Sequence, residues 1–258
     1  MLNNKTILIT GGTGSFGKKF LEMILDRYDP HRIIIYSRDE YKQSVMKAEY
    51  SKNYDMSKVR FFIGDVRDKD RLYRAFDHVD YVIHAAAMKQ VPTCEYNPFE
   101  AIKTNIHGAQ NVIDAAIDRG VKKVVALSTD KAVNPINLYG GTKLVSDKLF
   151  ITANAYSKIS KTKFSVVRYG NVAGSRGSII PIFKNIIDNG GNELPITDMR
   201  MTRFWITLEQ GVELVFKALA ESEGGETYIS KIPSFHISDL AEAMLPGCKI
   251  KEIGIREG

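Results

Sequence analysis

The segment from residue 5 to residue 28 constrains the fold more than any other part of the chain. Lys5–Thr10 is a short apolar run typical of a buried strand, a glycine-rich stretch follows it, and amphipathic spacing then predicts a helix to about Tyr28. Glycines here allow a tight turn and a close approach of the backbone to a pyrophosphate, and a helix N-terminus favours phosphates. A plain turn is the alternative. We predict a dinucleotide site whose contact residues are Gly11, Thr13, Gly14, Ser15, Phe16 and Gly17.

The second predicted strand, Arg32–Tyr36, bears on which dinucleotide is bound. An acidic residue at the end of this strand hydrogen-bonds a free ribose 2′-hydroxyl, whereas an arginine nearby accommodates a 2′-phosphate. Here Ser37 and Arg38 follow the strand, Lys42 comes soon after, and Asp39 is the acidic exception. The cations favour NADP over NAD, and we expect all four residues to contact the cofactor.

The ends of the third and fourth predicted strands supply further cofactor contacts. After Val59–Ile63, the Asp65 carboxylate can accept a hydrogen bond from the adenine amino group, beside Val66; an aspartate that only forms a turn is the alternative. After Asp80–His84, three small residues leave room for the nicotinamide side of the cofactor, namely Ala85, Ala86 and Ala87. Lys89 in the next loop is a candidate for a phosphate of substrate or cofactor, or else a solvated lysine.

A polar cluster follows the fifth predicted strand, Val124–Ser128. Ligands of open parallel sheets bind in the crevice beyond the carboxyl ends of the strands. Thr129, Asp130 and Lys131 come at that end, so we expect them to face the site.

A helix is predicted from about Tyr139, after Asn134-Pro135 interrupts regular structure. Tyr139 and Lys143 then share one helix face. A phenol, with a reference pKa of about 10, is a poor base near neutrality unless a nearby cation favours the phenolate. Lys143 is placed to be that cation, which predicts a catalytic pair; a surface Tyr–Lys pair is the alternative.

Two local patterns concern helices that support the site. The helix predicted over Pro98–Arg119 carries Asn105 on an apolar face, where a buried amide needs a reason such as a kink, a water or a neighbouring catalytic loop. Ser37 with Glu40 is typical of a capping box, as is Thr207 with Gln210.

The order of elements predicts the fold class. Five predicted strands alternate with helices before residue 150, and Phe164–Tyr169 adds a sixth. This alternation is typical of an α/β protein with a Rossmann-type doubly wound parallel sheet. Beyond it the alternation weakens, with helices expected at Ile180–Ile187 and Thr207–Leu219 and short strands at Tyr228–Lys231 and Ile250–Ile255.

We therefore expect a cofactor-binding domain over residues 1–170 and a small C-terminal α/β substrate-binding subdomain over residues 171–258. The second segment is rich in polar and cationic side chains suited to a diphosphate. Surface arginines are the alternative reading. The expected substrate contacts, together with Lys89, are Asn171, Arg176, Ser178, Thr197, Arg203 and Arg256.

Composition excludes several classes of function. The formal net charge is +6, but Lys and Arg are scattered and alternate with Asp and Glu, which argues against nucleic acid and for a mild bias toward anionic ligands. Cys94 and Cys248 are isolated, so we expect neither a disulfide scaffold nor a metal site, and a cytoplasmic protein. The sequence shows no signal peptide and no apolar run long enough to span a membrane.

Several of these motifs together resemble the extended short-chain dehydrogenase/reductases that act on nucleotide sugars. The residues behind this resemblance are Thr10–Gly17, Tyr139 with Lys143, and Arg168–Asn171. A narrower set resembles the inverting UDP-N-acetylglucosamine 4,6-dehydratases of the pseudaminic acid biosynthesis type. That set is Ser37–Glu40, Gly64–Arg67, Leu127–Lys131, Gly174–Ser178 and Met201–Phe204. Where the retaining sugar 4,6-dehydratases carry Asp-Glu, this sequence has Asp130-Lys131, as the inverting group does.

The resemblance implies a mechanism with tightly held NADP that ends each turnover as it began. Tyr139, with Lys143, would accept the C4 hydroxyl proton of a UDP-sugar while hydride leaves C4, and Thr129 would hydrogen-bond the C4 oxygen. Lys131 would remove the C5 proton, and Asp130 or Tyr139 would protonate the departing C6 hydroxyl. Hydride then returns to C6, and C5 is reprotonated on the opposite face. A homo-oligomer is also implied.

Two alternatives share the glycine turn. An NADP-dependent nucleotide-sugar 4-epimerase needs the Tyr–Lys pair but no C5 base, and a dinucleotide-sensing regulator needs neither. Members of the resembled family continue beyond the position of Gly258, so the expected second segment is truncated relative to them.

Overall fold

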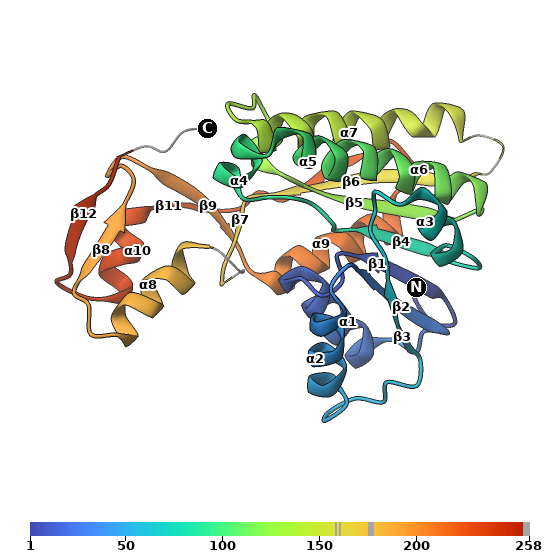
Figure 1. Ribbon diagram of the computed structural model, residues 1–258, viewed down its shortest axis with the longest axis horizontal. Coiled ribbons are helices and arrows are strands. Elements are labelled where there is room, and N and C mark those ends of the chain that lie inside the picture. The colour runs from blue at the N-terminus through green and yellow to red at the C-terminus, as the bar shows by residue number, and fades with distance from the viewer. Residues whose placement is uncertain (158, 160, 175–177, 255–258) are drawn as a thin grey trace.

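A computed structural model describes residues 1–157, 159, 161–174 and 178–254 of the chain. Its centre is a seven-stranded sheet in the order β10-β6-β5-β4-β1-β2-β3, in which every neighbouring pair is parallel (Figure 1). The strands are β1 (Thr6–Thr10), β2 (Arg32–Ser37), β3 (Val59–Ile63), β4 (Tyr81–His84), β5 (Lys123–Thr129), β6 (Lys163–Tyr169) and β10 (Thr227–Ile229). The predicted doubly wound α/β fold is confirmed.

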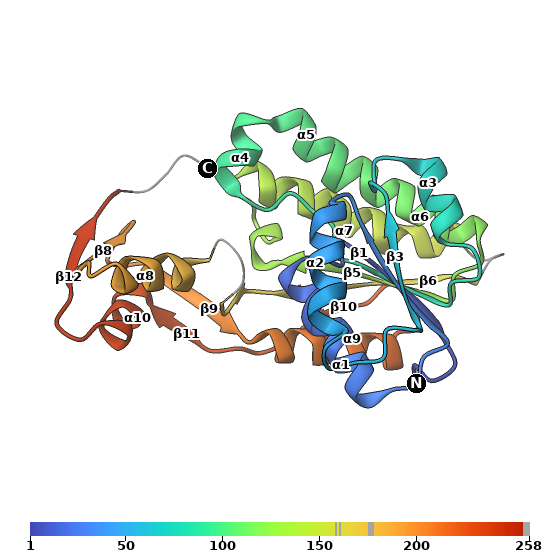
Figure 2. The same ribbon diagram turned by 60° about the horizontal axis from the view of Figure 1, so that its bottom comes forward.

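The inner strands bury both faces, because helices cover both sides of the sheet. Ile7 and Ile9 of β1 pack into one core cluster, and Leu8 between them packs into the other. The helices contributing to the first cluster are α1 (Ser15–Arg27), α2 (Glu40–Tyr50) and α9 (Leu208–Glu221). Those contributing to the second are α3 (Lys69–Ala75), α6 (Gly108–Asp118) and α7 (Leu138–Tyr156), as Figures 1 and 2 show. Period-two alternation of buried side chains thus produces the three layers.

The predicted helix over residues 98–119 is divided into three pieces. It consists of α5 (Pro98–Ile102), a π-helical turn (Lys103–His107) and α6, and it follows a short helix α4 (Val91–Tyr96). Asn105 lies in the π-helical turn and is fully buried. A π-helical turn widens the helix locally and is frequent at functional sites.

One of the two predicted capping boxes is confirmed and the other is wrong. Thr207 and Gln210 cap α9 reciprocally. Ser37, by contrast, still belongs to β2, and its hydroxyl accepts a hydrogen bond from Gln43 Nε2 at 3.0 Å. Asp39 is the N-cap of α2, because its carboxylate accepts the backbone N–H of Lys42. The acidic residue noted in the sequence therefore has a structural role.

The second segment forms a small α/β part beside the large sheet (Figures 1 and 2). It contains a three-stranded sheet in the order β11-β9-β7 and a parallel pair of β12 with β8. Its elements are β7 (Asn171–Val172), α8 (Ile179–Asp188), β8 (Glu193–Ile196), β9 (Thr202–Ile206), β11 (Ser234–His236), α10 (Ile237–Met244) and β12 (Lys249–Glu252). Between them, α9 and β10 return to the large sheet. In the described part of the chain, no helix has the length and apolarity needed to cross a membrane.

A substitution at Gly17 tests how tightly α1 packs against the turn before it. A Cβ at Gly17 would lie 2.3 Å from the backbone oxygen of Gly12, and backbone cannot move aside cheaply. We predict that Gly17→Ala lowers the free energy of unfolding by about 2 kcal/mol or more, measured by urea denaturation. Gly141→Ala is the matched control, because a Cβ there meets open space within α7 and should add up to about 1 kcal/mol. Equal effects of the two substitutions would contradict the packing argument.

His84 is a fully buried histidine at the end of β4. Its Nδ1 lies 2.9 Å from Thr10 Oγ1, and its ring packs against Phe150. Burial, aided by the charge of Lys143, lowers the pKa of His84 to about 3. The unfolded chain binds this proton below about pH 6.5, whereas the folded protein does not until about pH 3. The contribution of His84 to stability is thus constant above the pKa that its imidazole has in the unfolded chain. It is lost as the pH falls from that value toward the pKa of the imidazole in the folded protein.

We predict that the free energy of unfolding of the natural chain decreases by about 1.4 kcal/mol per pH unit through this one group between pH 6 and pH 4. In His84→Gln this contribution disappears, so a series of urea titrations should give a shallower slope against pH. His78→Gln removes an exposed histidine and serves as the control. Equal slopes for the natural chain and His84→Gln would show that folding does not lower the pKa of His84.

Candidate active site

A cavity of about 680 Å³ lies at the carboxyl ends of the parallel strands, where the chain crosses from β3 to β4 on the other side of β1. All predicted cofactor contacts line it, namely Gly11, Thr13, Gly14, Ser15, Phe16, Gly17, Ser37, Arg38, Asp39, Lys42, Asp65, Val66, Ala85, Ala86, Ala87, Tyr139 and Lys143. Thr129, Lys131, Lys89, Asn171 and Ser178 line it as well. The structure thus brings residues from both segments of the chain into one space.

The glycine turn fits a pyrophosphate. Gly11 has a φ of +65°, and a Cβ there would come within 2.9 Å of Ala86 backbone atoms, so no side chain fills the space. Gly14 at the N-cap of α1 contributes no side-chain cap, which leaves the helix N-terminus facing the cavity. The positive end of the helix dipole and the backbone N–H groups of this turn suit an anion.

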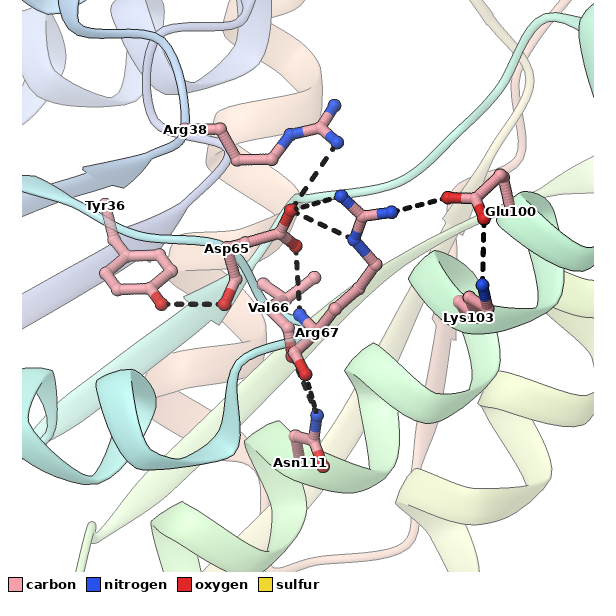
Figure 3. Close-up of polar contacts among 8 residues, drawn as sticks. All are labelled: Tyr36, Arg38, Asp65, Val66, Arg67, Glu100, Lys103 and Asn111. Atoms are coloured by element: carbon pink, nitrogen blue, oxygen red, sulfur yellow. Dashed lines mark hydrogen bonds and ion pairs between the residues drawn. The ribbon is translucent and has the colours of Figure 1, made fainter.

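The end of the cavity beside β2 and β3, where the adenosine of a dinucleotide was expected, is lined by charged groups that also contact one another (Figure 3). Asp65 Oδ2 lies 3.6 Å from Arg38 Nη1 and accepts hydrogen bonds from Arg67 Nε and Nη2 at 3.0 and 2.7 Å. Burial alone would raise the pKa of Asp65, but the hydrogen bonds and charge of Arg67, with that of Arg38, hold it below its ordinary value. The carboxylate is therefore ionised at neutral pH. Lys42 forms a close ion pair with Asp39, whereas the nearest carboxylate oxygen to Arg38 is the one at 3.6 Å.

Asn105 holds the loop that follows β4. Its amide accepts the N–H of Met88 at 2.8 Å and donates to the carbonyl of the same residue at 2.9 Å. It also donates to Thr142 Oγ1 on α7 at 3.0 Å. One fully buried side chain thereby fixes the loop carrying Met88 and Lys89 against the helix carrying Tyr139, which agrees with the expected role of a buried amide here.

Tyr139 and Lys143 project from α7 into the cavity. Burial raises the pKa of Tyr139 to about 12, and a hydrogen bond with Thr129 opposes this rise. Burial lowers the pKa of Lys143, and the charge of Asp147 opposes that change. Lys143 is 3% exposed and its amine has no hydrogen-bond partner among the described residues. Burial therefore acts against the charged form of each group, against the phenolate of Tyr139 and against the ammonium of Lys143.

Lys131 lines the same cavity from a 3₁₀ turn (Asp130–Ala132) that follows β5. Its ammonium donates to Asp130 Oδ1 at 3.1 Å and to Asn171 Oδ1 at 3.2 Å. Asp130 does not itself line the cavity, but it also accepts the Thr129 hydroxyl at 2.9 Å. The four polar groups Thr129, Asp130, Lys131 and Asn171 thus form one hydrogen-bonded cluster that can hold and exchange protons.

A buried ion pair supports this cluster from behind. Asp147 on α7 accepts hydrogen bonds from Ser128 Oγ and from Arg168 Nε, each at 2.8 Å, and is 1% exposed. The pair joins β5, β6 and α7 beneath the site. Breaking such a pair by removing one partner leaves an uncompensated buried charge. Arg168 belongs to the Arg168–Asn171 motif noted in the sequence, but its partner Asp147 on α7 could not be identified without the structure.

Two predicted substrate contacts lie away from the cavity lining. Thr197 Oγ1 donates to Met201 Sδ at 3.0 Å, and Arg203 Nη2 lies 3.1 Å from the same sulfur. Both belong to the small part of the chain, around β8 and β9. Arg176 and Arg256 lie outside the described residues.

Other lining residues were not among the predicted site residues. They are Tyr36, Gly64, Met88, Gln90, Thr93, Thr104, Leu127, Ser128, Tyr169, Gly170, Val172 and Leu208. Most adjoin predicted residues in sequence, so proximity to a strand end was the available signal. Thr93 lies on α4, four residues after Lys89, whereas Leu208 comes from α9, far along the chain, and no local pattern placed it at the cavity.

Known proteins with similar sequences match the whole chain. The "UDP-N-acetylglucosamine 4,6-dehydratase (inverting)" of Campylobacter jejuni strain 81-176 is 60% identical over 258 residues, which is 100% of this chain and 76% of that protein. The "UDP-glucose 4-epimerase" of Rickettsia canadensis is 46% identical over 265 aligned residues, covering 100% of this chain and 76% of its own length.

Solved structures agree with the fold. The X-ray structure of Pen from Bacillus thuringiensis has a TM-score of 0.94 and 44% identity, covering 100% of this chain and 82% of that one. The dTDP-glucose 4,6-dehydratase DesIV of Streptomyces venezuelae, at 22% identity, has a TM-score of 0.84 over 97% of this chain and 85% of its own, which shows the shared fold. The family described as "Polysaccharide biosynthesis protein" matches residues 7–258, and the chain belongs to that family, as the resemblance to the inverting dehydratases implied.

Proposed function

We propose that this protein is a UDP-N-acetylglucosamine 4,6-dehydratase that inverts C5 and releases a UDP-4-keto-6-deoxy-L-sugar. The observation that carries the proposal is that one cavity contains both the Tyr139–Lys143 pair and the amine of Lys131. An oxidation at C4 needs the first, and removal of the C5 proton needs a further base. The identity of 60% with an inverting dehydratase supports the same assignment.

NADP is the proposed cofactor, because Arg38 stands at the end of β2 where the 2′-substituent of the adenosine ribose is read. When bound, it supplies hydride exchange, accepting a hydride from C4 and returning it to C6. Tyr139 takes the C4 hydroxyl proton, and Lys143 stabilises the phenolate that accepts it. The Thr129 hydroxyl, next to Tyr139, holds the C4 oxygen.

Lys131 is the proposed base for C5. A ketone at C4 acidifies the neighbouring C–H, and the Lys131 amine, which lines the same cavity as Tyr139, removes that proton in the uncharged form that a base requires. The departing C6 hydroxyl is protonated either by Tyr139, which lines the cavity and holds the proton taken from the C4 hydroxyl, or by Asp130, 3.1 Å from the Lys131 amine. Reprotonation of C5 from the opposite face of the ring inverts the centre.

The remaining parts of the proposal concern the setting of the reaction. We assign substrate binding to the small sheets and helices within residues 171–258, since Asn171 and Ser178 reach the cavity. Cys94 and Cys248 are both free thiols, which supports a reducing cytoplasm. A homo-oligomer is proposed by analogy with related enzymes alone.

A nucleotide-sugar 4-epimerase is the second candidate, because relatives at 46% identity carry that name. Such an enzyme uses the Tyr–Lys pair but gains nothing from a C5 base. The placement of Lys131 within the cavity favours the dehydratase.

The reaction itself can be followed by proton NMR of the protein with UDP-N-acetylglucosamine and NADP⁺ in D₂O. We expect a new 6-deoxy methyl signal, deuterium at C5 and the ring couplings of the inverted sugar. A product that is only the C4 epimer, with no methyl signal and no deuterium at C5, would establish the epimerase instead.

Lys131→Met tests the base assignment. We predict that deuterium incorporation at C5 and formation of the methyl product fall together by about 10²-fold or more, because a positioned base contributes that much. Binding of the sugar nucleotide, measured by calorimetry, should persist. Lys148→Met is the control, since Lys148 is an exposed lysine of α7. Full C5 exchange in Lys131→Met would falsify the role of Lys131 while leaving the dehydratase assignment intact.

A further inference from the structure

Arg67 is a conspicuous cation that touches the cofactor cavity only through another residue. It does not line the cavity, whereas Asp65 and Arg38 do. Its guanidinium donates twice to Asp65 Oδ2, at 2.7 and 3.0 Å, and its backbone N–H donates to Asp65 Oδ1 at 2.9 Å. Figure 3 shows it on the side of Asp65 away from Tyr36. Both oxygens of this carboxylate are therefore occupied by one neighbour.

Arg38 approaches the same carboxylate but is not hydrogen-bonded to it. The separation of 3.6 Å from Arg38 Nη1 to Asp65 Oδ2 exceeds a hydrogen-bond distance, and the Arg38 side chain is 61% exposed. Among the described residues, Arg38 has no other ionic partner. A guanidinium satisfied by a carboxylate has fewer donors for a ligand, so the looseness of this contact keeps Arg38 available.

A second anchor holds Arg67 in place from the opposite side. Its Nη1 donates to Glu100 Oε2 on α5 at 2.5 Å, and Glu100 is paired in turn with Lys103 at 3.0 Å. Arg67 is thus stretched between Asp65 and Glu100 (Figure 3). Both ends of the fork are therefore engaged within the protein.

The balance of charge explains what this arrangement achieves. Around the adenosine end, Asp39 is paired with Lys42, Glu100 with Lys103, and Asp65 with Arg67. Of the two described cations that line the cavity here, Lys42 is paired and Arg38 has no hydrogen-bonded carboxylate. Without Arg67, the Asp65 carboxylate would be free to engage Arg38, which would leave that guanidinium less available to a phosphate.

We propose that Arg67 is a positioning residue for cofactor selectivity: by occupying the Asp65 carboxylate from outside the cavity, it leaves the Arg38 guanidinium free for a phosphate on the 2′-oxygen of the adenosine ribose. This inference rests on the proposed use of NADP. It adds that selectivity depends on a residue that never touches the cofactor.

The test is a comparison of two ligands that differ only in that phosphate. Binding of 2′-phospho-ADP-ribose and of ADP-ribose to the nucleotide-free full chain is measured by isothermal titration calorimetry. We expect Arg67→Gln to weaken binding of the phosphorylated ligand roughly tenfold, a change of the size that one well-placed charge makes, and to change the other ligand less than about twofold. Arg71→Gln is the control. This substitution removes the same charge from the same edge of the sheet, but the Arg71 guanidinium stacks on Phe62 and does not bind Asp65.

A double-mutant cycle separates this role from a merely structural one. In an Asp65→Asn background no carboxylate competes for Arg38, so adding Arg67→Gln should leave the ratio of the two affinities unchanged within about twofold. Loss of a fold-stabilising contact would lower both affinities in either background. Arg67→Lys keeps the positive charge but cannot donate two hydrogen bonds to one oxygen as arginine does, and it replaces Arg67→Gln if that variant does not fold. For Arg67→Lys we expect the ratio of the two affinities to fall about threefold.

The outcomes distinguish the two proposals. If the natural chain does not prefer the phosphorylated ligand, the assignment of NADP fails, and the inference about Arg67 fails with it. If the natural chain prefers that ligand and both Arg67 variants keep the full preference, only the role of Arg67 is overturned. If Arg67→Gln lowers the ratio equally in the Asp65→Asn background, the action through Asp65 is overturned.

Discussion

Parallel pairing of β1 with β2 on one side and with β4 on the other is the constraint on which the site depends. Because these three strands run in the same direction, their carboxyl ends meet at one edge of the sheet. The chain must cross over from β3 to reach β4, and this reversal opens the sheet's edge between neighbouring loops. The glycine turn after β1 and the alanines after β4 then face each other. The close approach of Gly11 to Ala86 is the direct result.

Burial gives the catalytic end of the cavity its chemical character. Lys143 and Tyr139 lie on α7 against the ends of β5 and β6, where water is largely excluded and charges interact strongly. The same burial makes each group costly to ionise alone. Behind them, Asp147 accepts hydrogen bonds from Ser128 and Arg168, and its negative charge opposes the lowering of the Lys143 pKa. The fold therefore supports the charged form of Lys143 through a carboxylate that does not line the cavity.

Local sequence was sufficient wherever a single turn or helix determines the geometry. The glycine spacing indicated the phosphate turn, and the spacing of Tyr139 and Lys143 indicated a shared helix face, because both depend on residues a few positions apart. It was insufficient for the N-cap of α2: Ser37 and Asp39 are both good capping residues, and only the length of β2 decides between them. Local sequence also could not show that Thr197 and Arg203 both contact Met201, because that contact depends on how the small sheets fold.

The two ends of the cavity are maintained by interactions that respond differently to conditions. At the adenosine end the contacts are ion pairs between partly exposed side chains, and salt screens such pairs over a distance of about 8 Å at physiological ionic strength. At the catalytic end they are hydrogen bonds of Asn105, Ser128 and Asp147, which are buried and little affected by salt. Salt can therefore weaken the contacts beside β2 and β3 while the buried hydrogen bonds are preserved. Because the loop held by Asn105 begins beyond β4 and Arg38 follows β2, the two sets of contacts lie on opposite sides of β1.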